Sequence, residues 1–306
     1  RIRPALVVIG YQAAGGKDHE RILRPAIAAE ILHAFFLIHD DIMDESNVRR
    51  CKPTVHRVFW ELYRELSRGL SDGDSEHLAV SMGLLAGDLC CNFGYRALTD
   101  SDFPADRIIR ATKRMHRMAD STLVGQVLDM LVPLQVDAAE ETVTKVHLLK
   151  TACYTFEAPL HLGMILADAG AEDLKRISSY AIPVGIAFQI QDDLLGVFGS
   201  EAELGKSVTS DLEEGKQTLL TTFTHAHGDE GQRARIASIV GKHGLATKDL
   251  EDARAIFREV GAVSYCERRA QKLVTAGKTA LEHVYLEGET SALLAKLADY
   301  TIHRKA

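Results

Sequence analysis

Two aspartate-rich segments contain the residues whose types and spacing could do chemistry together. The first is His39-Asp40-Asp41-Ile42-Met43-Asp44-Glu45, in which Asp40 and Asp44 are four residues apart and share one helix face. Like charges at this spacing repel, and a helix C-terminus disfavours anions further. Because the fold gains no stability from this placement, we expect a cation to offset it. Carboxylate oxygens suit Mg²⁺, which keeps several waters and bridges to phosphate.

A pair of arginines follows this first segment. Arg49 and Arg50 come five and six residues after Asp44. The planar guanidinium group binds phosphate through two parallel hydrogen bonds. Acidic ligands followed by an arginine pair are what a complex of a metal ion with a diphosphate requires. The alternative interpretation of the aspartates alone is a solvated acidic helix end.

The second segment, Phe188 to Gly196, also closes an apolar helix and contains Asp192 and Asp193. A polar loop follows it, with two Gly-Lys pairs at Gly205-Lys206 and Gly215-Lys216. Lysines on a glycine-rich loop can close over phosphate oxygens as point charges. An exposed loop with ordinary surface lysines is the alternative for this segment alone, but two such segments in one helical chain favour a shared diphosphate site.

Helical periodicity along almost the whole chain must position these residues. From Pro25 to Asp44, apolar residues recur at three- and four-residue steps. The same pattern covers Val80 to Leu98, Ile108 to Leu131, Val143 to Ala169, Leu174 to Val197, Lys216 to Phe223, Leu250 to Phe257, Val263 to Leu286 and Ser291 to His303. Polar, glycine-rich stretches separate these ranges, and there is no long linker. We therefore expect an all-α, single-domain bundle of about ten helices over residues 1–306.

Composition narrows the class of protein. With 46% hydrophobic residues the chain can bury a large core, and its net charge of −7 argues against a nucleic-acid surface. It contains no apolar run of the roughly 18 residues that a membrane span needs, and no signal peptide. The odd number of cysteines without a C-x-x-C spacing favours reduced thiols and a cytoplasmic location. These cysteines are Cys51, Cys90, Cys91, Cys153 and Cys266.

The segments together resemble the trans-isoprenyl diphosphate synthases, the polyprenyl synthetase family. Asp40 to Asp44 with Arg49 to Thr54 resembles the family's first aspartate-rich motif and its arginine loop, and Phe188 to Asp193 resembles the second motif. Gly125-Gln126-Val127-Leu128-Asp129 and Lys150-Thr151 resemble two motifs between them. The resemblance covers almost the whole chain, and it implies an isoprenoid synthase fold with a central cavity.

The resemblance implies an activity, a cofactor and partners. The reaction would be the Mg²⁺-dependent head-to-tail condensation of isopentenyl diphosphate with dimethylallyl, geranyl or farnesyl diphosphate. Three Mg²⁺ ions are expected, for which Mn²⁺ can substitute. Divalent ions and basic side chains in a water-excluded site would stabilise the charged leaving group as the allylic carbocation forms. A homodimer is also expected.

The resemblance assigns roles to matching positions. Asp40, Asp44 and Asp192 would ligate the metal ions, and Asp41, Asp129, Asp193 and Asp211 would hold metal-bound water or orient basic residues. The allylic diphosphate would contact Arg49, Lys150, Lys206 and Lys216. Isopentenyl diphosphate would be held by Arg3, His33 and Arg50, with Phe188 against its tail. Thr151 and Gln189 would point oxygens at the carbocation. Together with two of the lysines that contact the allylic diphosphate, they make up the expected catalytic residues, which are Lys150, Thr151, Gln189 and Lys206.

The chain departs from the family pattern in three places. Gly196 replaces the last aspartate of the second motif, which we expect to be harmless. Cys51 replaces the usual glycine after the arginine pair, so we expect a slightly altered loop. In the family a Gly-Gly-Lys precedes the arginine that matches Arg1, so we expect a segment before Arg1 that would add an isopentenyl-binding lysine.

Phe35 and Phe36 predict the product length. Phe36 lies one turn, roughly 5.4 Å, before Asp40 on the same helix face, and Phe35 is its neighbour. Two rings below the diphosphate site would form a floor, as in the pattern of farnesyl diphosphate synthases, which favours a C15 product with C20 next. The alternative is that both rings only pack in the core.

Two other functions compete with this interpretation. A class I terpene cyclase shares the first metal motif, but usually has an Asn/Ser/Glu second motif and no Arg-Arg-x-x-Pro-Thr loop. A non-catalytic subunit of a heteromeric prenyl synthase typically loses one or both aspartate motifs, whereas this chain has both.

Overall fold

The computed structural model describes all residues except 67–70, 135–138, 201–206 and 305–306. Lys206, one of the expected catalytic residues, therefore lies outside the described residues. The first half contains α1 (Ile2–Ala13), α2 (Leu23–Met43), α3 (Val55–Leu66), α4 (Asp72–Thr99) and α5 (Ala105–Leu131). The rest contains η1 (Val132–Leu134), α6 (Glu140–Val146), η2 (His147–Glu157), α7 (Ala158–Leu166), α8 (Ala171–Phe198), α10 (Ser210–Glu213), α11 (Leu219–His227), α12 (Glu230–Ile239), α13 (Thr247–Glu259), α14 (Ala262–Leu281) and α15 (Thr290–His303). The predicted all-α class is confirmed.

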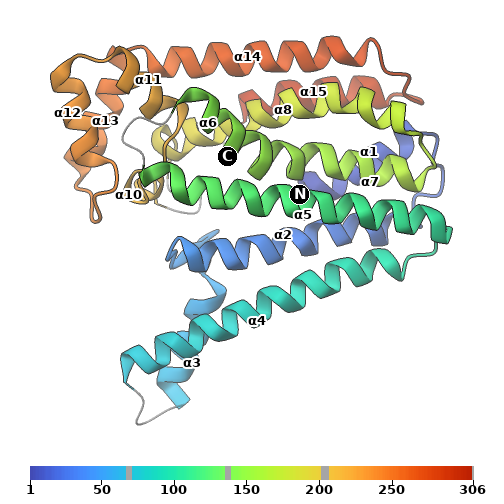
Figure 1. Ribbon diagram of the computed structural model, residues 1–306, viewed down its shortest axis with the longest axis horizontal. Helices are drawn as coiled ribbons and strands as arrows, with labels where there is room; N and C mark the ends of the chain where they lie inside the picture. Colours follow the sequence, from blue (N-terminus) through green and yellow to red (C-terminus); the bar gives the residue numbers. More distant parts are fainter. Residues whose placement is uncertain (67–70, 135–138, 201–206, 305–306) are drawn as a thin grey trace.

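The long helices run side by side, and several of them end at one end of the bundle. Figure 1 shows the C-terminal ends of α2, α5 and α8 at the left, beside α10. Packing between α2 and α4, between η2 and both α5 and α8, and between α8 and α14 holds them there. Both aspartate-rich segments end their helices at this place, so the bundle brings together residues that are far apart in the sequence.

Local signals fix where the helices begin. The hydroxyl of Ser71 accepts a hydrogen bond of 3.1 Å from the backbone N–H of Asp74 and so caps the start of α4. The carboxylate of Asp229 accepts one from the backbone N–H of Gln232, whose side-chain oxygen in turn accepts from the N–H of Asp229 at the start of α12. Such caps satisfy N–H groups that have no partner inside the helix.

A buried apolar core lies behind the site. Phe156 of η2 and Tyr180 of α8 are fully buried among side chains of α8, α14 and α15. Burial of one large apolar side chain contributes about 1.5–3 kcal/mol, so this core holds η2 and α8 firmly against each other. The carbonyl oxygen of Leu294 accepts the hydroxyl hydrogen of Tyr180 at 2.8 Å, which ties α15 to the same core.

The segment η2 is a π-helix, continuous with α6 before it and α7 after it. Periodicity predicted one helix over Val143 to Ala169, but not this widened stretch, which contains Lys150 and Thr151. π-Helical turns are rare and often occur at functional sites. A Cβ atom on Gly125 of α5 would lie 2.6 Å from the backbone nitrogen of Lys150, so only glycine allows α5 to approach η2 this closely.

A two-stranded hairpin follows α2. Strand β1 (Val48–Arg49) pairs antiparallel with β2 (Lys52–Pro53), and Arg50 and Cys51 form the turn. Both turn residues have positive φ, 54° and 59°, as the type I′ turn of a tight hairpin requires. Glycine suits such positions, whereas a residue with a Cβ is strained there. Cys51, where the family usually has glycine, therefore occupies a strained backbone position in this turn.

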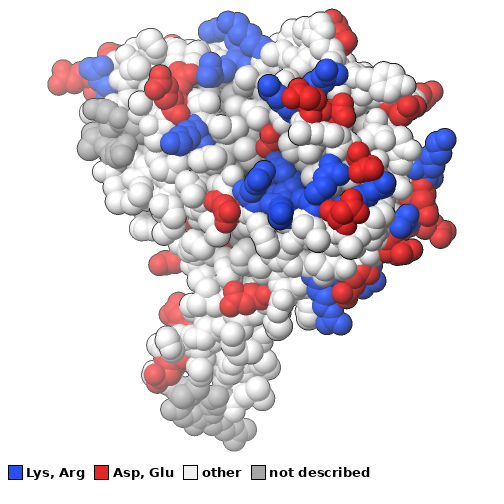
Figure 2. Space-filling model, turned by 45° about the vertical axis from the view of Figure 1, so that its right-hand side comes forward, with Lys and Arg blue, Asp and Glu red and all other residues white. Residues whose placement is uncertain are grey.

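Two helices, α4 and α8, are long and apolar enough to pass a test for a membrane span by length and hydropathy. Half of the apolar window of α8 is buried inside the bundle, so this helix belongs to the core. The window of α4 is 22% buried. In Figure 1, α3 and the start of α4 form an arm below the body, and the face of this arm that is turned to the viewer in Figure 2 is mostly uncharged.

Candidate active site

One cavity of about 360 Å³ lies between α2, α5, η2 and α8. Asp40 of the first motif and Asp192 of the second both line it, together with Lys150 and Thr151 of η2. The arginine pair lines the same cavity, as do Arg3 and His33. The two aspartate motifs therefore face one shared space, which is the arrangement that a metal–diphosphate site requires.

Arg49 holds the first motif in place. Its Nε donates a hydrogen bond of 2.6 Å to a carboxylate oxygen of Asp41, and its Nη2 lies 3.5 Å from Asp40. Asp41 is only 4% exposed, and burial raises its pKa although Arg49 opposes the shift. Asp41 thus orients the side chain of Arg49, whereas Asp40 lines the cavity.

Lys150 joins η2 to the first motif and to α5. Its Nζ lies 2.7 Å from a carboxylate oxygen of Asp129 and 3.3 Å from one of Asp40. Burial alone would lower the pKa of Lys150, but the two carboxylates raise it above its ordinary value. Burial likewise favours a higher pKa for Asp40, and the cations around it, Lys150 foremost, bring it below the ordinary value. Both shifts favour the charged forms of Lys150 and Asp40.

Lys216 makes the corresponding contacts to the end of α2. Its Nζ lies 3.4 Å from Asp44 and 3.7 Å from Asp211, and it also pairs with Glu214. Burial disfavours its charge, yet the surrounding carboxylates raise the pKa of Lys216 well above the ordinary value. Burial raises the pKa of Asp44, an effect that Lys216 opposes.

The departure at Gly196 has a steric explanation. A Cβ atom on Gly196 would lie 2.2 Å from a carboxylate oxygen of Asp211. Any larger residue there would displace Asp211, which contacts Lys216. In this chain the carboxylate of Asp211 thus fills the space beside the second motif that a side chain at position 196 would need.

A chain of hydrogen bonds orients the residues expected near the carbocation. The hydroxyl of Thr151 donates to the side-chain oxygen of Gln189 at 2.6 Å, and the amide nitrogen of Gln189 donates to Asp193 at 2.8 Å. The other carboxylate oxygen of Asp193 lies 3.0 Å from Nε2 of His147. Asp193 is buried, so it positions Gln189, whereas Asp192 lines the cavity.

Sequence reasoning missed Arg304 and His147. Arg304 follows α15, pairs with Asp192, and places its guanidinium 3.8 Å from the centre of the Phe188 ring. In the sequence Arg304 is only a weak signal, because a basic residue near a helix end is common. His147 carried no separate signal, since its partner Asp193 is distant in the sequence.

A second basic group gathers at the other side of the cavity. Nη2 of Arg3 donates to the hydroxyl of Thr155 at 2.7 Å, and its guanidinium lies 4.2 Å from the centre of the Tyr154 ring. His33 bonds through Nδ1 to the hydroxyl of Tyr154. Burial, followed by Arg3, Arg50 and other arginines, lowers the pKa of His33 to about 2. This concentration of positive charge suits an anionic group such as a diphosphate.

The donor chemistry fits Mg²⁺ bound together with a diphosphate. Within the part of the chain that the structure describes, no group of three or more His, Cys, Asp or Glu could hold a metal ion by itself. Mg²⁺ is usually held by one or two carboxylates plus substrate phosphates, so such a closed cluster is not required. Asp40, Asp44 and Asp192 each pair with a cationic side chain here, which shows that their position calls for positive charge.

Part of the cavity wall is apolar. Phe35 and Phe36 line it, with ring centres 4.7 Å apart, and Leu123 adds to the wall. The cavity can therefore bind charged groups at its basic and acidic side chains while its apolar wall accommodates hydrocarbon. An amphiphilic diphosphate ester is the class of substrate that such a cavity matches.

Comparisons with known proteins agree with this geometry. The polyprenyl synthetase family profile matches residues 1–257. The geranylgeranyl diphosphate synthase of Saccharolobus solfataricus is 32% identical, covering 100% of this chain and 86% of that protein. The (2E,6E)-farnesyl diphosphate synthase of Mycobacterium tuberculosis is also 32% identical, covering 100% and 79%. Geranylgeranyl pyrophosphate synthase of Corynebacterium glutamicum, solved with isoprenyl diphosphate and magnesium, superposes with a TM-score of 0.93 at 33% identity, covering 99% and 86%. The chain is thus a prenyltransferase that belongs to the polyprenyl synthetase family.

Proposed function

We propose that this protein joins isopentenyl diphosphate head-to-tail to an allylic diphosphate with Mg²⁺, and that C15 is the favoured product, followed by C20. The observation that carries the proposal is that Asp40 and Asp192 line one cavity whose wall also contains Phe35 and Phe36. The same cavity offers one cationic group near the aspartates and another around Arg3 and His33. Each cationic group would bind the diphosphate of one substrate, and the hydrocarbon parts of the two substrates would meet between them.

In the proposed reaction the allylic C–O bond breaks and its electron pair leaves with the diphosphate. Arg49, Lys150 and Lys216 hold that leaving group, and bound Mg²⁺ would supply additional charge stabilisation. The double bond of isopentenyl diphosphate then attacks the allylic carbon, which forms the new C–C bond. A proton lost from the adjacent carbon passes to the departing diphosphate. The oxygens of Thr151 and Gln189, 2.6 Å apart, would face the cation.

Arg3, His33 and Arg50 would bind the diphosphate of isopentenyl diphosphate, with Phe188 packed against its tail. All four line the cavity. The neutral form of His33 can donate one hydrogen bond while its other nitrogen binds Tyr154. Lys206 would join the allylic diphosphate, a role that lies outside the described residues.

Three Mg²⁺ ions would bind, with Mn²⁺ as a substitute, ligated by Asp40, Asp44 and Asp192. Their pairing with Lys150, Lys216 and Arg304 supports this set, because a divalent ion can replace a cationic side chain as the neutralising group. Titration of the protein with Mg²⁺ and inorganic diphosphate by calorimetry would give the number of ions.

A homodimer is proposed through α4 and α5. Large apolar side chains stay exposed on both helices, and contiguous patches of this kind mark interaction surfaces. They are Leu84, Leu85, Leu89 and Phe93 of α4, and Val124, Val127 and Met130 of α5. We further propose one polyprenyl synthetase domain over residues 1–306 and a cytoplasmic location, which the free cysteines support.

The deciding experiment is a product assay. Purified protein is incubated with isopentenyl diphosphate and a C5, C10 or C15 allylic diphosphate, with and without Mg²⁺, and products are separated by reversed-phase chromatography. We expect Mg²⁺-dependent formation of farnesyl diphosphate. Release of a hydrocarbon from the allylic substrate alone would instead indicate a cyclase, and no turnover by the pure protein would indicate a subunit that needs a partner.

A further inference from the structure

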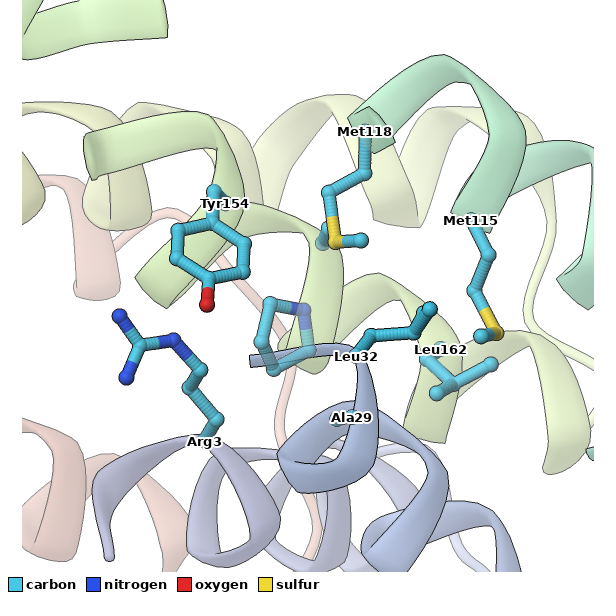
Figure 3. A pocket seen from close by; sticks show the side chains of 9 residues that line it. Arg3, Ala29, Leu32, Met115, Met118, Tyr154 and Leu162 are labelled. Atoms are coloured by element: carbon cyan, nitrogen blue, oxygen red, sulfur yellow. The ribbon is translucent and has the colours of Figure 1, made fainter. Parts of the chain in front are cut away.

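A second, much smaller cavity lies directly behind Tyr154. Its volume is about 10 Å³, and Figure 3 shows Tyr154 and Arg3 on one side of it and Met118, Met115 and Leu32 on the other. Tyr154 and Arg3 line both this cavity and the large one. The side chain of Tyr154 is therefore part of the wall between the two spaces.

The small cavity continues the large one along the helices, away from the aspartates. On α2 the wall steps from Asp40 and Phe36 in the large cavity to Leu32 in the small one, one turn at a time. On α5 it steps in the same direction from Thr122 to Met118. A hydrocarbon chain that grows away from the diphosphate would meet these levels in that order.

The ring of Tyr154 is held from several sides. It is 5% exposed and lies edge-on to Phe36, with ring centres 5.1 Å apart. The guanidinium of Arg3 covers its face, and its hydroxyl is bonded to Nδ1 of His33. Because η2 carries it on a backbone that packs against both α5 and α8, the ring cannot swing aside without breaking these contacts.

The side of the small cavity opposite Tyr154 is adaptable. Met115 and Met118 are unbranched and flexible, and such side chains can repack around an added ligand. The cavity itself holds no more than about one water, so space for hydrocarbon would come from removal of the Tyr154 ring and repacking of these methionines. The rigid element between the two cavities is the aromatic ring.

We propose that Tyr154 is a specificity-determining residue for product length: its ring is a partition, edge-on to Phe36, that closes the way along α2 and α5 towards Leu32 and Met118 to a further isoprene unit. The inference rests on the proposed prenyl diphosphate synthase function. It also predicts an order of effects, because Met118 lies behind the partition and can matter only once the ring is gone.

The test compares Tyr154→Leu, Tyr154→Met and Tyr154→Phe with the wild type, each verified as folded by circular dichroism. With a C15 primer we expect Tyr154→Leu and Tyr154→Met to lengthen the main product by at least one isoprene unit. Tyr154→Phe keeps the ring and so the product length, but raises KM for isopentenyl diphosphate, because His33 loses its hydroxyl partner. Adding Met118→Ala should lengthen the product further in the Tyr154→Leu background and change nothing alone.

Tyr180→Leu is the matched control, since Tyr180 is also a buried tyrosine but lines neither cavity. It should lower stability without changing product length. A binding assay without turnover separates this inference from the proposed function: Tyr154→Leu should bind geranylgeranyl diphosphate at least about tenfold more tightly than the wild type does. Unchanged product length together with unchanged affinity in both Tyr154→Leu and Tyr154→Met would overturn the inference. Absent turnover in the wild type with the affinity gain intact would count against the proposed function alone.

Discussion

The Nζ atom of Lys216 lies 3.4 Å from a carboxylate oxygen of Asp44, a residue 172 positions earlier in the chain. This contact joins the end of α2 to the second Gly-Lys pair across the mouth of the site. Lys216 also contacts Asp211 and Glu214, so its charge stays neutralised if Asp44 is removed. The role of Asp44 in the reaction can therefore be separated from its role in stability.

Asp44→Asn should lower kcat/KM by about 10²–10³-fold, because one charged ligand of the metal–diphosphate complex is lost. The free energy of unfolding should change little, since Lys216 keeps two carboxylate partners. Steady-state kinetics over a Mg²⁺ series, with urea unfolding, would measure both. Asp102→Asn, at an exposed aspartate outside the cavity, is the control. Full activity of Asp44→Asn would remove Asp44 from the proposed ligands.

Phe36→Ala should lengthen the product, because it removes the first ring below Asp40. Stability should fall by less than the roughly 3–5 kcal/mol typical of a fully buried Phe→Ala change, since Phe36 is only half-buried. Reversed-phase analysis of products from C5, C10 and C15 primers would show the shift. Phe223→Ala, on α11, removes a similar ring away from the cavity and should leave the C15 product as it is. A Phe36→Ala enzyme that still stops at C15 would make the ring a packing residue only.

Cys51→Gly should stabilise the protein by about 1–2 kcal/mol, because glycine adopts the positive φ of 59° without Cβ strain. Cys51→Ala removes the same exposed thiol but keeps a Cβ, so it should give no comparable gain. Urea unfolding of the three proteins measures the difference. Equal stability of the Gly and Ala variants would mean that the hairpin opens before the global transition.

The free energy of unfolding should decrease at acidic pH because His33 is buried in its neutral form. The folded pKa of His33 is about 2 against an ordinary 6.5, so the unfolded state binds more protons between these values. Stability is therefore full above pH 6.5 and declines as pH falls, by up to about 1.4 kcal/mol per pH unit from this residue. His33→Gln should flatten the decline of the unfolding free energy between pH 6.5 and 4.5. If the unfolding free energies of the two proteins changed in parallel with pH, His33 would bind protons equally well in the folded and the unfolded state.

Leu85→Glu together with Val127→Glu should convert a dimer into monomers, since both positions are more than half exposed in the isolated chain. A stable interface buries about 1,200–2,000 Å² and tolerates unpaired charge poorly at its centre. Light scattering after size exclusion would report the mass. Leu293→Glu, an exposed position on α15, is the control. A dimeric mass for the double variant would place the interface elsewhere.

Apolar periodicity in the sequence predicts the long helices, because this pattern depends only on residues close together in the chain. The periodicity over Pro25 to Asp44 corresponds to α2, and the aspartates stand at its end, because a long apolar stripe determines both the helix and the face it buries. The helix α12 buries only Ile236 and Ile239, so its apolar stripe is too sparse to show a period, and the two-residue strands β1 and β2 are too short to show one.

Long-range contacts were harder to foresee. The pairing of Arg304 with Asp192 joins residues 112 positions apart, and no local pattern marks either partner for the other. The role of Gly125 illustrates the same limit. It was recognised as part of a motif, but its function in letting α5 touch the backbone of Lys150 depends on how two helices pack.

The widened turns of η2 make this stretch unusually sensitive to length. In an α-helix each residue adds about 100° of rotation, so deleting a single residue between His147 and Lys150 would rotate every later side chain by roughly that angle relative to α6. Lys150, Thr151 and Tyr154 would then point away from the cavity together, although none of them had been changed. Redesign of this enzyme can therefore vary the side chains of η2 that lie outside the cavity, but has to preserve the number of residues between α6 and α7.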